Sequence, residues 1–287
     1  MLNLLFGEVN MFKKILVLLV LFANYNVVFS QEKVGNPTFF QYEPIRSQKH
    51  TSVTLSDLEN HLPANHTFAS DEIVNWCHEN THGINSLLRV KYCYTNKSKR
   101  TNAFYTLDNK FVIVEEPKIT LSDVAKNIPE SLRGTSYELY FIDQIGDWND
   151  RSLYVFDEWV SFTNGSVCCV EMSVDARRAS IRQMVDFNIY SICVAMTTKE
   201  QDKDYDDKEL KAFLRWNIER SFEVIDKEVQ VFELIDRNKK LNDKQLNNKE
   251  RVIEYLRMFQ LSEDANELRA FCFDYFGPEW TKKYFNF

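Results

Sequence analysis

Apolar residues recur at helical spacing in several stretches of the chain, and polar segments separate these stretches. The first clear pattern predicts a helix from about Ser70 to Arg89, with Ser70 as its N-cap and two acidic residues at the positive end of the helix dipole. Helical periodicity also appears in six later segments: 119–132, 153–162 (LYVFDEWVSF), 180–196, 210–231, 252–259 and 266–276. Asn149 and Asp150 are expected to cap the helix that contains residues 153–162.

Two short runs between these helices have the pattern of a β-hairpin. Residues 103–107 and 110–114 flank Asp108 and Asn109, which suit a tight turn. Residues 31–66 are polar and carry three prolines, so an extended arm over the core is expected there. Together these patterns predict an α+β fold that is mainly helical and has a small sheet.

Composition and charge exclude some classes of partner. Hydrophobic residues make up 44% of the 287 residues, which is enough for a large core. The net charge is -7, and Lys and Arg are scattered instead of clustered, so no nucleic-acid partner is expected.

The N-terminal region has the pattern of a secretory signal. Lys13 and Lys14 precede an apolar run over residues 15–23, and the small residue Ser30 stands before Gln31. Residues 1–30 are therefore predicted to be a signal peptide, whose true start could be Met11. The mature protein is expected to be secreted or periplasmic and without a membrane anchor; the alternative is an uncleaved anchor, for which the apolar run is short.

The six cysteines lie outside this signal and show no CxxC spacing, so they are interpreted as buried small residues or disulfide partners. They are Cys77, Cys93, Cys168, Cys169, Cys193 and Cys272. The segment Asn164-Gly165-Ser166 is one of three glycosylation sequons, which matter only if the source glycosylates its exported proteins.

The first predicted helix contains the sequence HENTH. His78 and His82 are four residues apart, so their side chains lie about 40° apart around the helix axis and can face one ion. Glu79 lies beside the same face, where it can reach a water held by a metal. This is the H-E-x-x-H pattern, in which two neutral imidazoles bind zinc and the glutamate acts as general base. The bland alternative is an amphipathic helix with two unrelated histidines.

The third metal ligand is predicted to be a downstream carboxylate, because the chain has no histidine after position 82. Glu158 is the best candidate, since it lies in an apolar helical run where a carboxylate is costly to bury without a partner. Its neighbour Asp157 is the second choice, and Glu138 and Glu171 are weaker ones. In the alternative without a metal, Glu158 pairs with an arginine such as Arg89.

A histidine pair on one helix, followed by a glutamate on a second helix, resembles the gluzincin group of zinc metallopeptidases. The resemblance covers about residues 70–165 and implies a helix-rich zincin-like region with a small mixed sheet, whose edge strand pairs with an extended peptide. Residues 103–116 are in the right order for that strand, residues 31–200 would form the catalytic region, and residues 201–287 would pack on it as helices.

The resemblance also implies specific roles, and the chain departs from the thermolysin-like branch in two of them. His78, His82 and Glu158 would be the zinc ligands, and Glu79 the general base. The aspartate of the N-E-x-x-S-D helix is replaced by Phe162, so a ligand histidine must be oriented from elsewhere. A downstream histidine that stabilises the oxyanion is also absent; three tyrosines could replace it, namely Tyr137, Tyr140 and Tyr154.

Two functions are consistent with these patterns. The first is an exported zinc metallopeptidase that binds one zinc ion and cleaves a peptide or protein substrate. The second is a non-catalytic exported binding protein or a degenerate peptidase. The position of Glu158 relative to the two imidazoles discriminates between a metal site and no metal site.

Overall fold

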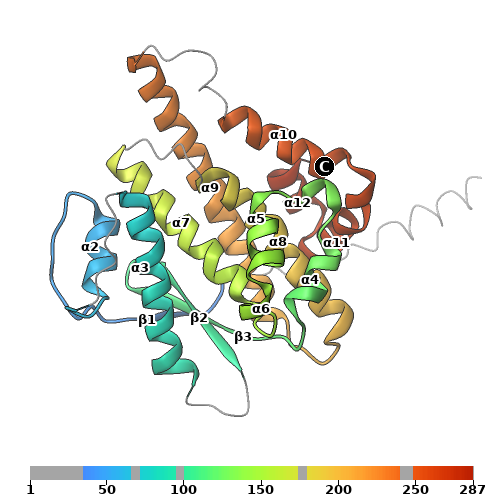
Figure 1. Ribbon diagram of the computed structural model, residues 1–287, viewed down its shortest axis with the longest axis horizontal. Helices are drawn as coiled ribbons and strands as arrows, with labels where there is room; N and C mark the ends of the chain where they lie inside the picture. Colours follow the sequence, from blue (N-terminus) through green and yellow to red (C-terminus); the bar gives the residue numbers. More distant parts are fainter. Residues whose placement is uncertain (1–34, 66–71, 95–99, 174–179, 240–247, 287) are drawn as a thin grey trace, which may run out of the picture. The chain divides into compact units, whose positions relative to one another are not determined.

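The computed structural model describes residues 35–65, 72–94, 100–173, 180–239 and 248–286 (Figure 1). The predicted signal peptide, the Ser70 cap and the sequon residues 66–67 and 96–98 lie outside these ranges. The helices are α2 (Val53–Asn60), α3 (Ile73–Leu88), α4 (Leu121–Asn127), α5 (Thr135–Tyr137), α6 (Ile145–Trp148), α7 (Tyr154–Met172), α8 (Ser180–Gln201), α9 (Lys208–Lys239), α10 (Asn248–Leu261), α11 (Asn266–Phe276) and α12 (Pro278–Phe285). The strands are β1 (Phe39–Gln41), β2 (Thr101–Leu107) and β3 (Lys110–Glu115).

Short irregular helices complete the order of elements. Two of them are π-helical, η1 (Arg89–Cys93), which continues α3, and η3 (Glu138–Asp143). Two are 3₁₀ turns, η2 (Glu130–Leu132) and η5 (Glu263–Ala265). The predicted α+β class is confirmed. Among the described helices, none is long and apolar enough to span a membrane.

The described strands form one antiparallel sheet in the order β1-β3-β2. The predicted hairpin of β2 and β3 is present, with Phe104 paired to Val112. Its turn is tight, because Leu107, Asp108 and Asn109 all have positive φ angles. The mixed sheet implied by the resemblance is wrong for this part of the chain, where every strand pair is antiparallel.

The free edge of β2 lies against α3 and α7 instead of being open along its length. At Tyr105, the backbone N–H donates to Asn85 Oδ1 at 2.7 Å, and the carbonyl accepts from Asn164 Nδ2 at 2.9 Å. A strand edge can pair with a peptide only where its backbone groups are unoccupied. The expected pairing of a peptide with this edge is therefore blocked at Tyr105.

Helix α7 lies between α3 on one side and α8 and α9 on the other (Figure 1). Thirteen of its 19 residues are buried, including Asp157 and Glu158. Gly165 lets α3 approach closely, because a Cβ atom there would lie 3.0 Å from the Val74 carbonyl oxygen and 3.8 Å from His78 Cβ. The same helix buries Asn164 completely, so its sequon is not accessible in the folded chain.

A glutamate distant in sequence accepts hydrogen bonds at the N-terminus of α7. Its N-cap is Leu153, whose N–H donates to Glu116 Oε1 at 2.7 Å, and Ser152 Oγ donates to the same oxygen at 3.1 Å. A carboxylate at this position is stabilised by the unpaired N–H groups and the helix dipole. The predicted caps were wrong: Asn149 instead accepts from Ser122 N–H at the start of α4.

The segment expected to be an extended arm contains helix α2, with Ser52 as its N-cap. Glu171, at the far end of α7, accepts hydrogen bonds from Ser52 Oγ, Thr54 N–H and Thr54 Oγ1.

The helix predicted for residues 119–132 is shorter than expected; α4 stops at Asn127, and Glu130–Leu132 form a 3₁₀ turn after Pro129. All six cysteines are buried, and none of them forms a disulfide in this structure.

Candidate metal centre

Helix α3 presents both histidines to α7, and α7 presents Glu158 to the histidines. His78 Nε2 and His82 Nε2 are 3.1 Å apart. His78 Nε2 lies 3.5 Å from Glu158 Oε2, and His82 Nε2 lies 3.5 Å from Glu158 Oε1. The three side chains form a buried group that could hold a metal ion, as predicted from the sequence.

The spacing of these atoms suits tetrahedral coordination. Zinc binds imidazole nitrogen and carboxylate oxygen at about 2.0–2.2 Å, and two ligands at a tetrahedral angle are then about 3.3–3.5 Å apart. The two imidazole nitrogens are 3.1 Å apart, and each lies 3.5 Å from a different oxygen of Glu158. With one ligand atom taken from each residue, the three atoms lie within 4.8 Å of one another. Two imidazoles and one carboxylate are also a ligand set of catalytic zinc sites, which keep a fourth position open.

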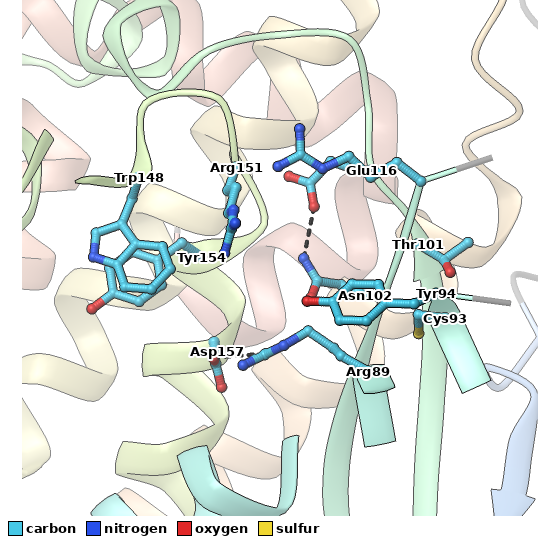
Figure 2. Close-up of a pocket in the computed structure, with 11 residues that line it drawn as sticks. Arg89, Cys93, Tyr94, Thr101, Asn102, Glu116, Trp148, Arg151, Tyr154 and Asp157 are labelled. Atoms are coloured by element: carbon cyan, nitrogen blue, oxygen red, sulfur yellow. Dashed lines mark hydrogen bonds and ion pairs between the residues drawn. The ribbon is translucent and has the colours of Figure 1, made fainter. Parts of the chain in front are cut away.

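Asp157 binds the ring nitrogen of His82 that is not turned toward Glu158. His82 Nδ1 lies 3.1 Å from Asp157 Oδ1, so Nδ1–H donates to the carboxylate and Nε2 faces Glu158. Asn85 Nδ2 donates to the same oxygen of Asp157 at 2.5 Å. Arg89 Nη1 donates to its other oxygen at 2.9 Å, and Figure 2 shows this pair. The second-choice ligand is therefore a partner of a ligand histidine, and the arginine expected for Glu158 in the alternative pairs with Asp157.

His78 is held differently. Its Nδ1 is buried and has no hydrogen-bond partner among the described residues. Its ring packs on Phe162, with the ring centroids 4.3 Å apart. Phe162 occupies the position where the resembled family has an aspartate. This single difference explains why His78 Nδ1 has no acceptor and why the His78 ring packs on an apolar side chain. The two histidines thus differ in how firmly their tautomers are set.

Two phenols bind the oxygens of Glu158. Tyr140 donates to Oε2 at 2.9 Å, and Tyr154 donates to Oε1 at 2.6 Å. Both tyrosines were expected as oxyanion donors, and the structure places their hydroxyls on the candidate ligand carboxylate. Tyr137, the third tyrosine considered, stacks on Phe141 at 5.5 Å and lies under the Arg133 guanidinium.

The charges of the cluster shift the pKa values of its members in opposite directions. Burial alone would lower the pKa of His82, but the charge of Asp157 and hydrogen bonds to Asp157 and Glu158 raise it well above its usual value. Burial, followed by the charge of His82, lowers the pKa of His78 to about 4. Burial would raise the pKa of Glu158, yet its hydrogen bond to His82 and the charges of the two histidines lower it. The charges of the cluster thus favour the protonated form of His82, while burial favours the neutral form of His78.

Glu79 is half-buried on α3 and makes no hydrogen bond or ion pair with any described residue. Its charge contributes to the raised pKa of Tyr140, after burial and after the charge and hydrogen bond of Glu158. Its role as general base stays a prediction. The weaker candidate Glu171 caps α2 instead, and Glu138 lies on the exposed side of η3.

Asn85 and Arg89 are functional-site residues that the sequence patterns did not single out in these roles. With His78 and His82 they occupy positions i, i+4, i+7 and i+11 of one helical line, which places all four on the face toward α7. That spacing was available in the sequence. The choice of Asp157 as their common partner depends on the packing of α3 against α7.

No protein-family model, no curated protein and no solved structure matches this chain. The geometry of the cluster is therefore the basis for a functional proposal.

Proposed function

We propose that this chain is an exported, zinc-dependent metallopeptidase of the zincin type, with His78, His82 and Glu158 as zinc ligands. The observation that supports the proposal is the convergence of two imidazole nitrogens, 3.1 Å apart, and one carboxylate with an oxygen 3.5 Å from each of them. Zinc, when bound, supplies a Lewis acid that polarises a carbonyl and makes water a nucleophile near neutral pH.

The protein's own residues divide the remaining work. Glu79 takes a proton from the attacking water at its carboxylate and gives it to the leaving amine. Asp157 keeps the proton of His82 on Nδ1, so that Nε2 presents its lone pair. Tyr140 and Tyr154 hold the two oxygens of Glu158 and fix the orientation of the carboxylate.

The engagement of these phenols also supports a second candidate function. An oxyanion donor must point at the reacting carbonyl, whereas both hydroxyls here bind Glu158. A zinc-binding protein without turnover, in which the pocket is kept for recognition, fits this observation.

Metal content tests the proposal first. Purified protein is expected to contain one zinc per chain by elemental analysis, and His78→Ala should lose it. His50→Ala is the matched control, because His50 contacts Glu59 on the exposed surface and not the cluster. Zinc-free protein that does not take up added zinc would rule out the proposal.

Turnover is tested separately with a mixed-sequence peptide library and mass spectrometry of the products. Glu79→Gln should retain zinc and lose cleavage, since the amide cannot accept the proton. Zinc-loaded wild type that cleaves no peptide would leave the second candidate as the function.

A further inference from the structure

A cavity has a volume of about 290 Å³. Figure 2 shows the residues that line it. Two residues of its wall also belong to the surroundings of the metal ligands. Asp157 accepts a hydrogen bond from His82, and Tyr154 donates to Glu158 at 2.6 Å. The cavity therefore shares two wall residues with the candidate metal centre and lies next to it.

Three arginines from different elements line this cavity: Arg89 from η1, Arg100 before β2, and Arg151 before α7. Each guanidinium has five N–H donors. Within the described part of the chain, Arg89 gives one hydrogen bond to Asp157 and Arg100 gives one to Asp150. Arg151 gives none to a side chain and lies over the Trp148 ring, 5.5 Å from its centroid. Most of these donors therefore have no side-chain acceptor among the residues that the structure describes.

The two acidic residues of the wall are already occupied. Glu116 accepts from Asn102, Ser152 and Leu153, and both oxygens of Asp157 accept from protein groups. The cavity therefore offers unused cationic donors and acidic groups whose acceptors are committed.

One side of the cavity is aromatic. Trp148 and Tyr154 stack with centroids 4.2 Å apart and planes at 9°. This pair supports Arg151 from below by a cation–π contact and gives an apolar surface beside the guanidinium. A group with a planar anionic end and a short apolar stem matches both parts of the wall.

We propose that this cavity binds a carboxylate of the peptide substrate, with Arg151 and Arg100 as its principal partners. Arginine forks bind carboxylates in two parallel hydrogen bonds, which gives orientation as well as attraction. The inference deepens the proposed function, because it assigns the metallopeptidase a preference for acidic peptides. The carboxylate is either the C-terminus of the substrate or an Asp or Glu side chain.

Peptide binding tests the inference without requiring turnover. Three probes are an acetylated penta-alanine with a free C-terminal carboxylate, the same peptide amidated, and the amidated peptide with one central glutamate. Their affinities are measured by calorimetry with the Glu79→Gln variant, with zinc and without it. At least one carboxylate peptide is expected to bind about tenfold or more tighter than the neutral one, as for a charged hydrogen bond.

Substitution of the arginines identifies where the carboxylate binds. Arg151→Gln, and separately Arg100→Gln, should remove most of the preference while leaving the binding of the neutral peptide unchanged. Arg257→Gln is the matched control, because Arg257 is an exposed arginine on α10 that does not line the cavity. The peptide that shows the preference tells whether the C-terminus or the side chain is recognised.

Failure of the inference can be told apart from failure of the proposed function. Equal binding of all three peptides, or a preference unchanged in both arginine variants, overturns the inference even if zinc-dependent cleavage is found. An arginine-dependent preference for a carboxylate peptide supports the cavity assignment even if the protein never cleaves a peptide.

Discussion

Replacing Asp157 by asparagine is the sharpest test of how the cluster is held. Asp157 is 5% exposed, and its oxygens bind His82, Asn85 and Arg89. Asparagine keeps the shape but removes the charge that raises the pKa of His82. The change therefore acts on the metal through a histidine, without deleting a ligand.

The size of the effect follows from these contacts. Loss of a carboxylate behind a ligand histidine lowers metal affinity by about 10- to 100-fold, or about 1.4–2.7 kcal/mol. The charge of Asp157 also has an effect that weakens zinc binding. It raises the pKa of His82, so zinc must displace a proton from this histidine, and wild-type zinc affinity falls as the pH falls. With Asp157→Asn that competition weakens, and the affinity loss should be largest at pH 9 and smaller at pH 6. The metal-free variant also loses stability, by less than the 3–5 kcal/mol of a fully buried broken pair, because 20% of the Arg89 side chain is exposed.

Competition with a chelating zinc indicator measures the affinities across this pH range, and circular dichroism checks the fold. Glu116→Gln is the control, since it neutralises another hydrogen-bonded buried carboxylate near α7 that does not contact a candidate ligand. Zinc affinity of Asp157→Asn equal to wild type at pH 9 would refute this account of His82. An equal loss in Glu116→Gln would show that general destabilisation is responsible.

Two further changes test other parts of the structure. Phe162→Asp should tighten zinc binding by up to about tenfold, because the aspartate gives His78 Nδ1 an acceptor, and it should lower stability because packing on Phe187 is lost. The same indicator measures the zinc affinity. An unchanged affinity would contradict the role assigned to the missing acceptor. Burial raises the pKa of Asp186 to about 6, so the folded chain holds a proton between about pH 4 and 6 that the unfolded chain releases. Asp186 alone should therefore lower the free energy of unfolding by about 3 kcal/mol as the pH rises through that window. Urea titrations should show this contribution as the difference in pH dependence between wild type and Asp186→Asn, because all other groups titrate in both proteins.

The local parts of the fold and the candidate ligands were predictable because their signals lie within a few residues. Helical spacing placed His78 and His82 on one face, and the lack of later histidines directed attention to Glu158. The prediction that these three meet is confirmed. The hairpin of β2 and β3 was predictable for the same local reason.

What could not be predicted depends on partners distant in the chain. Adjacent Asp157 and Glu158 differ only by about 100° around α7, and the position of α3 decides which one faces the metal side. Glu116 caps α7 from 37 residues away, so the nearer Asn149 and Asp150 were chosen wrongly. Likewise, α2 lacks a local signal strong enough to outweigh the polar composition of its surroundings, and Glu171 stabilises it from the far end of α7.

Hydrogen bonds join the β2–β3 hairpin to α7 at two points. The length of helix between these points is about the same as the length of strand between them. Leu153 N–H binds Glu116, and Asn164 binds the carbonyl of Tyr105, which pairs with Phe111. Eleven residues of helix rise about 16 Å, and the five residues from Phe111 to Glu116 extend about 17 Å. The length of the strand therefore sets the axial position of α7. One residue inserted into β3 or into this half of α7 would break one of the two joints and displace Glu158 from the histidines.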